Sequence, residues 1–496
     1  MRNAEGAGQQ VPGSLPERLE HQKRAFISEG PPSAAVRRHR IDRLTALMVD
    51  HSDALAQAMR DDFGSRSPAA SMLTEIVAIS SIIEHTRDRL ESWMRPRRPV
   101  WVPGLRAEIA PTPKGVVGVI GPWNFPLNLV ALPTVEALAA GNRVMIKMSE
   151  VTSHTADAFA TLVPQYFDRS EIDVVTGDIG VAEEFAALPF DHLFFTGSPQ
   201  VGTLIARAAA EHLVPVTLEL GGKNPAVIAP DANIERSAIR IVRGRMVNGG
   251  QACVCPDYVF VPQDRIGQFV SAATRELHTM FPTIVANPDY CSSVNDANYQ
   301  RVLRLLDDAR ANGAQITSVV PHGEVLPDHA SRKIPPTLVT DVDPKMLLAT
   351  EEIFGPVLSV MGYRTTDEVV DHVNLHPSPL VAYWYGSDGP DFRDFVRRTR
   401  TGGVARNDFA LQMSLSQTPF GGVGRSGTGA YHGKAGFDTF SHHRSIVGSD
   451  LPFTVTSIAA PPFTRSSFLL ARFSILSTRR RARQRIRDFE KRSANV

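Results

Sequence analysis

The stretch GVVGVIGPWNFPLNLVALPTVEALAAGNRVMIKMSE, residues 115–150, indicates the architecture of a large part of this chain. Its first six residues form a short apolar run that is typical of a buried strand, and residues 127–140 are typical of a helix that ends at Gly141. Residues 143–147 have the pattern of a second strand. A strand, a helix and a further strand in this order predict a parallel pair with a right-handed crossover.

The alternation of strands and helices extends on both sides of this stretch. Before it, apolar residues at helical spacing predict amphipathic helices over residues 33–63. After it, further strands are predicted at 173–175, 192–195, 214–220, 225–229, 257–262, 336–339, 357–363, 380–386 and 403–407. The sequence therefore predicts an α/β protein with two domains that meet near Gly221.

The composition is that of a globular chain of 496 residues, long enough for two or three domains. A formal net charge of +1 predicts no nucleic-acid partner. Three cysteines cannot form a disulfide framework, and the N-terminus lacks the pattern of a signal peptide, so we expect a cytoplasmic protein. No apolar run approaches the roughly 20 residues of a membrane span.

Both ends of the chain differ from the rest in composition. Residues 1–32 are rich in Gly, Pro and Gln, which predicts a flexible N-terminus. Residues 451–496 are basic and predict an amphipathic helix or a solvated tail, with association of this tail with a membrane as the less favoured outcome.

The segment NGGQACVCPDYVF, residues 248–260, contains Cys253 and Cys255. A structural zinc site commonly needs four ligands, and Cys291 is the only other cysteine, so we expect no metal. A disulfide between residues two apart in an extended segment would be strained. A buried structural pair and a nucleophile beside a bystander remain as interpretations of this segment alone.

Two further turns lie where open α/β sheets bind ligands. In FFTGSPQVG, residues 194–202, Gly197 and Gly202 frame a turn before a helix, which suits a phosphate but also fits a plain strand–helix turn. In VMIKMSE, residues 144–150, Lys147 and Glu150 could contact a ribose or form a solvated ion pair.

Three polar side chains occupy similar positions. Asn124 in GPWNFP could donate to a developing oxyanion or cap its own turn. Glu219 in LELGGK could be a general base or form an ion pair with Lys223. In EEIFGP, Glu352 and Phe354 could hold a ribose and pack a ring, or form a polar turn over the core.

Taken together and in this order, these stretches resemble the aldehyde dehydrogenase superfamily over roughly residues 35–450. The matching segments are GPWNFP, IKMSE, FTGSPQVG, LELGGK, NGGQAC, EEIFGP, GGVARND and PFGGVGRSG. The ending GGVGRSGTGAYHGKAGFDTFSHHR resembles the class 3 branch. GNRVMIKMSE and RKIPPTLVTDV are most similar to coniferyl aldehyde dehydrogenases within that branch.

The resemblance implies a role for each matched residue. Cys253 would be the nucleophile, with Cys255 a non-catalytic neighbour. Asn124 and the Cys253 backbone N–H would bind the oxyanion, hydride would leave for a nicotinamide, and Glu219 would activate the water that hydrolyses the thioester. Asn407 would lie in a turn near the substrate end. The implied cofactor-binding residues are Trp123, Lys147, Glu150, Gly197, Ser198, Gly202, Leu220, Glu352 and Phe354.

The resemblance also implies a Rossmann-type cofactor domain, an α/β catalytic domain and a small β oligomerisation element. The strand expected before Phe440 would help to form a homodimer. Residues 33–93 and 111–220 would bind NAD(P), 221–405 would form the catalytic domain, 94–110 and 406–450 the bridging element, and 451–496 the tail. Because Glu150 would repel a 2′-phosphate, NAD is expected, with NADP possible.

The implied substrate is an aromatic, cinnamyl-type or medium to long aliphatic aldehyde. Two departures from the family pattern bear on this site: Met148 replaces the usual Pro, and residues 408–418 lack the usual acidic pair. Glu219 favours water over coenzyme A as the acyl acceptor. The alternative is a catalytically silent nucleotide-binding structural protein, and the intact set of Cys253, Glu219 and Asn124 argues against it.

Overall fold

The computed structural model describes residues 13–452 and 460–493, and contacts divide the chain into two compact units. The first comprises Met1–Arg95 and Pro111–His443, and the second comprises Pro96–Ala110 and Arg444–Val496. The first unit contains two large sheets, and the predicted α/β fold is confirmed. The chain leaves the first sheet at Leu220 and enters the second at Pro225, but both sheets belong to one compact unit.

The first sheet has six strands in the order β15-β7-β6-β3-β4-β5. Strand β15 is antiparallel to β7, and the other neighbours are parallel. The parallel strands are short and almost wholly buried, as expected where helices cover both faces. The bounds are β3 Val116–Ile120, β4 Arg143–Lys147, β5 Ile172–Val175, β6 His192–Gly197, β7 Val216–Leu220 and β15 Gly427–Thr428.

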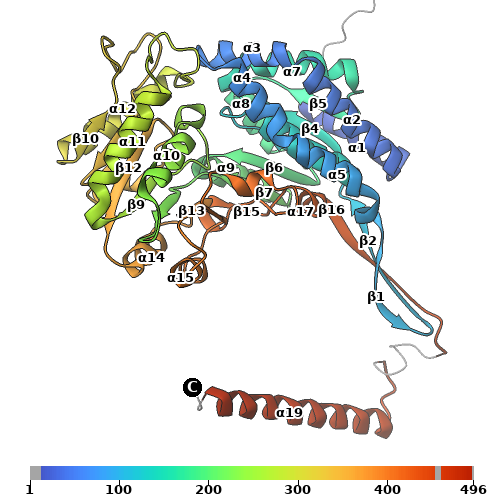
Figure 1. The fold of residues 1–496 in the computed structure, drawn as a ribbon. Helices are drawn as coiled ribbons and strands as arrows, with labels where there is room; N and C mark the ends of the chain where they lie inside the picture. Colours follow the sequence, from blue (N-terminus) through green and yellow to red (C-terminus); the bar gives the residue numbers. More distant parts are fainter. Residues whose placement is uncertain (1–12, 453–459, 494–496) are drawn as a thin grey trace, which may run out of the picture. The chain divides into compact units, whose positions relative to one another are not determined.

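The second sheet has seven strands in the order β10-β11-β12-β9-β8-β13-β14, and only β10 is antiparallel to its neighbour. Figure 1 shows helices α10 and α11 over strands β9 and β12. The strands are β8 Pro225–Ile228, β9 Tyr258–Pro262, β10 Gln315–Ser318, β11 Thr337–Thr340, β12 Val357–Tyr363, β13 Val381–Tyr385 and β14 Gly403–Arg406.

Helix α6 is the most deeply placed helix in the described part of the first unit. All of its 13 residues are buried, and it ends at Gly141, whose φ of 96° suits the predicted C-cap. The α-helices of this unit are α1 Leu15–Glu29, α2 Ala34–Asp50, α3 Ser52–Phe63, α4 Pro68–Ser71, α5 Ala78–Met94, α6 Asn128–Ala140, α7 Ser153–Tyr166, α8 Ile179–Ala186, α9 Pro199–Ala210, α10 Ile234–Arg245, α11 Ile266–Met280, α12 Asp296–Ala311, α13 Leu347–Thr350, α14 Thr366–Leu375, α15 Pro390–Arg398, α16 Leu411–Ser414 and α17 Lys434–Thr439. Short turns are η1 Met72–Val77, η2 Glu150–Thr152, η3 Val247–Gly250, η4 Gln263–Arg265 and η5 Gly424–Ser426.

The N-terminal segment differs from the flexible stretch expected over residues 1–32. Helix α1 occupies Leu15–Glu29 and buries Leu15 and Leu19. Gln22 Nε2 donates to the Val144 carbonyl at 3.1 Å, which ties the helix to strand β4. The Gly and Gln residues that suggested flexibility lie mainly in residues 1–12, which fall outside the described residues.

The described residues of the second unit contain most of a three-stranded sheet and one long helix. The sheet has the order β1-β2-β16, with β1 Arg97–Val102, β2 Leu105–Pro113 and β16 Ser441–Ser449. Strand β16 follows Phe440, so the strand expected before Phe440 is wrong: that segment is helix α17, because Phe437 and Phe440 are buried three residues apart.

The basic end of the chain forms a helix. Helix α19, Arg465–Ser493, has no buried residue. Within the described ranges, no helix is both long and apolar enough to cross a membrane.

Candidate active site

The turn before Cys253 is built from three consecutive residues in the left-handed region. Asn248, Gly249 and Gly250 have φ values of 51°, 65° and 79°. A Cβ at Gly250 would lie 2.1 Å from the Gly355 carbonyl oxygen, so only glycine fits there. The NGG sequence therefore lets the chain that carries Cys253 pass close to the EEIFGP loop.

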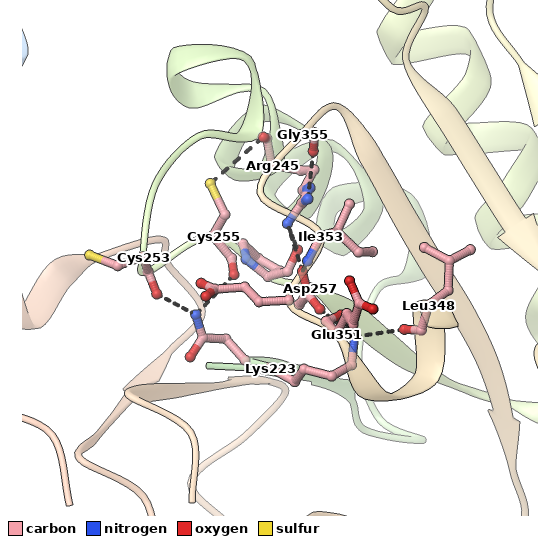
Figure 2. Close-up of polar contacts among 12 residues, drawn as sticks. Lys223, Arg245, Cys253, Cys255, Asp257, Leu348, Glu351, Ile353 and Gly355 are labelled. Atoms are coloured by element: carbon pink, nitrogen blue, oxygen red, sulfur yellow. Dashed lines mark hydrogen bonds and ion pairs between the residues drawn. The ribbon is translucent and has the colours of Figure 1, made fainter. Parts of the chain in front are cut away.

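Cys253 and Cys255 do not share a face, which corrects the expectation of an extended segment. The Cys255 N–H donates to the Ala252 carbonyl at 3.0 Å, and the resulting turn sends the two side chains in different directions (Figure 2). Cys255 is buried and its Sγ donates to the Gly244 carbonyl at 3.3 Å, whereas Cys253 is only partly buried. All three cysteines are free thiols.

Asn224 fixes the backbone on both sides of this turn. Its Nδ2 donates to the carbonyls of Cys253 at 2.6 Å and Cys255 at 3.1 Å. Its Oδ1 accepts from the Val381 N–H at 3.0 Å. The side chain at the start of β8 thereby holds the Cys253 loop against the central strands of the second sheet.

Lys223 forms an ion pair with Asp257 rather than with Glu219, so the ion pair considered from the sequence is wrong. Its Nζ also donates to the carbonyls of Leu348 at 2.7 Å and Glu351 at 3.0 Å (Figure 2).

Asp257 also anchors the EEIFGP loop. Its Oδ1 accepts from the Ile353 N–H at 3.0 Å and lies 3.3 Å from Arg245 Nη1. Arg301 Nη1 donates to the Glu352 carbonyl at 3.0 Å. These contacts fix the backbone of the loop on which the Glu352 side chain lies.

Two carboxyl groups, those of the buried Glu219 and the half-buried Glu352, act on the Cys253 thiol. Burial raises the pKa of Cys253, and the charges of Glu352 and Glu219 raise it further. The group is therefore a neutral thiol here and needs a base before it can attack a carbonyl.

The same two carboxyl groups have raised pKa values of their own. Burial, and then the charge of Glu136, raises the pKa of Glu219 well above its ordinary value, and neither oxygen has a protein hydrogen-bond partner. Burial, and then the charge of Asp257, raises the pKa of Glu352 to about 8. A Cβ at Gly221 would lie 2.3 Å from Glu352 Oε2, so the glycine pair makes room for that carboxyl.

Asn124 lies beside the Cys253 turn and does not cap its own turn. Its Nδ2 donates to the Gln251 carbonyl at 3.1 Å, and its carbonyl accepts from Arg66 Nη1 at 3.1 Å and Asn248 Nδ2 at 3.0 Å. Because an amide nitrogen carries two hydrogens, one remains for another acceptor. The arrangement is suited to a substrate oxygen near Cys253.

Trp123 and Phe354 come together although they lie far apart in the sequence. Their ring centroids are 5.3 Å apart in an edge-on arrangement. Phe354 has a φ of 49°, which is rare for a bulky residue and which the loop contacts enforce. The pair forms an aromatic wall next to Asn124.

Lys147 and Glu150 also lie together, at the end of β4. Lys147 Nζ donates to the carbonyls of Met148 at 2.7 Å and Gly177 at 3.0 Å and lies 3.6 Å from a Glu150 oxygen. Burial lowers the pKa of Lys147, and Glu150 opposes this change. The lysine is buried while the Glu150 carboxylate is exposed and can accept from a hydroxyl group.

Gly197, Ser198 and Gly202 form the turn that begins helix α9. Ser198 caps the helix by accepting from the Val201 N–H at 3.3 Å. A Cβ at Gly202 would lie 2.7 Å from the Leu220 side chain, so glycine allows α9 to pack closely on β7. A helix N-terminus at the end of a parallel strand fits a dinucleotide pyrophosphate.

Asn407 has a structural role in its turn. Its Oδ1 accepts from the Gly386 N–H at 2.9 Å, and its Nδ2 donates to the Gly386 carbonyl at 2.8 Å.

Sequence reasoning missed Asn224 and Asp257, although both sit directly beside predicted motifs. Among the described residues, no three His, Cys, Asp or Glu side chains are grouped as a metal site would require.

Comparison with known proteins identifies relatives along most of the chain. The aldehyde dehydrogenase family profile matches residues 20–446. A probable coniferyl aldehyde dehydrogenase of Caulobacter vibrioides is 44% identical over 434 residues, which cover 86% of this chain and 90% of that protein. A dimeric, NADP-preferring aldehyde dehydrogenase of Rattus norvegicus is 35% identical and covers 88% of this chain and 95% of its own length.

Solved structures give the same result. The substrate-bound state of Staphylococcus aureus AldH is 31% identical with a TM-score of 0.85, and covers 93% of this chain and 100% of that chain. A mutant of Pseudomonas syringae aldehyde dehydrogenase C, in complex with NAD+ and octanal, is 29% identical with a TM-score of 0.78 and covers 88% and 89%. The similarity found from the sequence motifs is confirmed.

Proposed function

Because this chain belongs to the aldehyde dehydrogenase family and oxidises aldehydes with NAD(P), we propose that Cys253 is its nucleophile and that its substrate is an aromatic, cinnamyl-type aldehyde. The substrate class is supported by the names of two relatives, the probable coniferyl aldehyde dehydrogenase of Caulobacter vibrioides at 44% identity and a coniferyl aldehyde dehydrogenase of a Pseudomonas species at 42%. Medium to long aliphatic aldehydes are the second class to be tested.

The surroundings of Cys253 support its role over the other two cysteines. Cys253 is partly exposed and lies within the electrostatic influence of Glu219 and Glu352. Cys255 is buried and bonded to a carbonyl. Burial raises the pKa of Cys291 to about 11, and the charges of Arg66 and Lys333 lower it.

The chain's own groups can carry out the covalent steps. The Cys253 proton passes through the carboxylate of Glu219 or Glu352 to bulk water, and the Cys253 sulfur adds to the aldehyde carbon. The Asn124 amide and the Cys253 N–H stabilise the oxyanion, each by about 3 kcal/mol. A bound nicotinamide supplies the acceptor for the substrate hydride. Ionised Glu219 then takes a proton from water, the hydroxide adds to the thioester carbon, and the C–S bond breaks to release the acid.

The test is substitution of Cys253 with its neighbours as controls. Cys253→Ala should abolish turnover of coniferyl aldehyde with NAD, because no covalent intermediate can form, while Cys291→Ser should retain activity within about twofold. Turnover is followed by the absorbance of reduced nicotinamide on a panel of aromatic and aliphatic aldehydes. Activity in Cys253→Ala, or its loss in Cys291→Ser, would transfer the role to Cys291.

NAD is the proposed nucleotide. The Glu150 side chain is 43% exposed beside the buried Lys147, and its negative charge would oppose a 2′-phosphate. The rat relative, by its name, prefers NADP. Rates with NAD and NADP on the same aldehyde decide between the two.

A homodimer and a cytoplasmic location remain predictions. The first is supported by the word "dimeric" in the name of the rat relative and is measured by sedimentation. The second is supported by the low number of cysteines. No observation favours the silent structural protein, and membrane association of the basic C-terminal helix stays the less favoured prediction.

A further inference from the structure

Helix α6 carries a buried carboxyl group, Glu136, that the proposed reaction does not use. Glu136 is fully buried. The N–H groups of His432 and Gly433 face its carboxyl, but neither oxygen has a protein hydrogen bond of normal geometry. A Cβ at Gly436 would lie 1.8 Å from Glu136 Oε2, so helix α17 leaves room for this side chain. An unpartnered buried carboxylate costs several kcal/mol, and the group therefore tends to hold a proton.

Glu219 lies on the sheet face that helix α6 covers. Strand β7 alternates, and its Leu218 and Leu220 side chains pack in the core on the opposite face. On the α6 side, Thr217 Oγ1 bonds His192 Nε2 at 2.9 Å. Thr196 is the register partner of Glu219, and its hydroxyl also lacks a protein partner. Unpartnered polar atoms therefore gather in this one buried layer.

Within the described part of the chain, no cation acts on either carboxyl group. Burial lowers the pKa of His432 to about 3, so this ring stays neutral. The buried Tyr431 ring packs on Phe194 of β6 with 5.2 Å between centroids, and burial, followed by the charges of Glu219, Cys253 and Glu136, raises the pKa of Tyr431. Arg37 is engaged with the carbonyls of Pro32 and Ala139. Further titratable groups on the surrounding elements include His192 on β6, His85 on α5, and Lys434 and Asp438, which pair with each other on α17.

We propose that Glu136 and Glu219 form a coupled buried pair that holds one proton between them, so that Glu136 sets the pH at which Glu219 becomes a base. The inference rests on the proposed role of Glu219. Two negative charges in one buried layer repel strongly, so the pair loses its protons in two separate steps. When the proton changes place, one O–H bond breaks and the other forms, and the charge of the pair stays at −1. Glu136 acts through Glu219 and is a positioning residue.

The first test is the pH profile of acyl-enzyme hydrolysis in a single turnover, in the wild type and in Glu136→Gln. Below about pH 7 the two rates should agree within about twofold, because a protonated Glu136 resembles Gln. Burial raises the pKa of Glu136 to about 8. Above that pH the negative charge of Glu136 keeps Glu219 protonated. Glu136→Gln should therefore hydrolyse the acyl-enzyme faster than the wild type, by about tenfold for each unit by which the substitution lowers the pKa of Glu219.

The control is Glu136→Asp, which keeps the charge and should keep the two-step profile of the wild type. A merely structural role would change the rate at every pH alike. Superimposable profiles of the wild type and Glu136→Gln would overturn the inference.

A second measurement does not need activity. The infrared C=O stretch of buried protonated carboxyl groups is titrated in the wild type and in Glu219→Gln. Coupling predicts that the band of Glu136 titrates over a different pH range when Glu219 is replaced, and an unchanged band would contradict the pair. Because this result is independent of turnover, it separates failure of the pair from failure of the proposed nucleophile and base, and it remains available if Glu136→Gln does not fold.

Discussion

The end of strand β7 and the start of strand β9 each bury a carboxyl group, but they do so in opposite ways. Asp257 is 1% exposed, forms ion pairs with Lys223 and Arg245, and accepts the Ile353 N–H. Glu219 is 3% exposed and has no protein partner. A fully partnered buried charge fixes the loops around it, whereas an unpartnered one keeps the capacity to bind and release a proton. The difference separates a structural acid from a reacting one.

The largest effect is expected where the partnered acid is removed. Asp257→Ala removes the negative charge that pairs with two largely buried cations, Lys223 and Arg245. The free energy of unfolding should fall by about 3–5 kcal/mol, as measured by urea denaturation.

The matched control for this change is a surface acid. Asp307 pairs with Arg310 on exposed side chains, so Asp307→Asn should change the free energy of unfolding by less than about 1 kcal/mol. Equal effects of the two substitutions on the free energy of unfolding would show that the buried ion pairs of Asp257 stabilise the fold no more than a surface ion pair does.

Removal of the unpartnered acid should affect the reaction and not the fold. Glu219→Gln should slow acyl-enzyme hydrolysis about 100-fold, which corresponds to about 2.7 kcal/mol, because the base is lost. The rate is measured in a single turnover, with nucleotide binding as the control for an intact site.

The same variant has a predicted pH dependence of stability. The pKa of Glu219 is raised in the folded chain, so its contribution to stability is fully present below the ordinary pKa and is lost as the pH rises toward the folded value. Glu219→Gln lacks this loss, and its free energy of unfolding relative to the wild type should increase with pH. A variant that is less stable at every pH would show that Glu219 has a structural partner.

The comparison also shows what the sequence could predict. The sequence predicts strands at 115–120 and 143–147, and the structure has them at 116–120 and 143–147, because apolar runs between turn residues depend only on local composition. Cys253 and Glu219 stood out because their motifs are local as well. The partners of Asp257 come from Lys223, 34 residues away, and Ile353, 96 residues away, and no local pattern encodes such contacts.

Three features of the fold and the site could not be predicted from the sequence for a similar reason. Helix α1 is held by contacts with strand β4, more than 100 residues further along the chain. In the sequence, Glu136 is only one polar residue of a predicted helix. The packing of helix α17 against it shows that its carboxyl group is buried. The turn at Cys253 depends on the approach of Gly250 to Gly355, which the NGG sequence permits but does not specify.

The smallest effect on stability is expected at Cys255. Cys255 and Cys253 repeat the contrast between Asp257 and Glu219, with thiols in place of carboxyl groups. Its thiol is buried and donates to the Gly244 carbonyl, whereas the Cys253 thiol is partly exposed and lies near the unpartnered Glu219. Cys255→Ala should cost about 1 kcal/mol of unfolding free energy, because a small volume and a weak hydrogen bond are lost, and turnover should stay within about twofold. Cys253→Ala should show the reverse, with near wild-type stability and no turnover. If Cys255→Ala instead stopped turnover without loss of stability, a thiol with a hydrogen-bond partner would be the reacting group. The presence of a partner would then no longer separate structural groups from reacting groups in this chain.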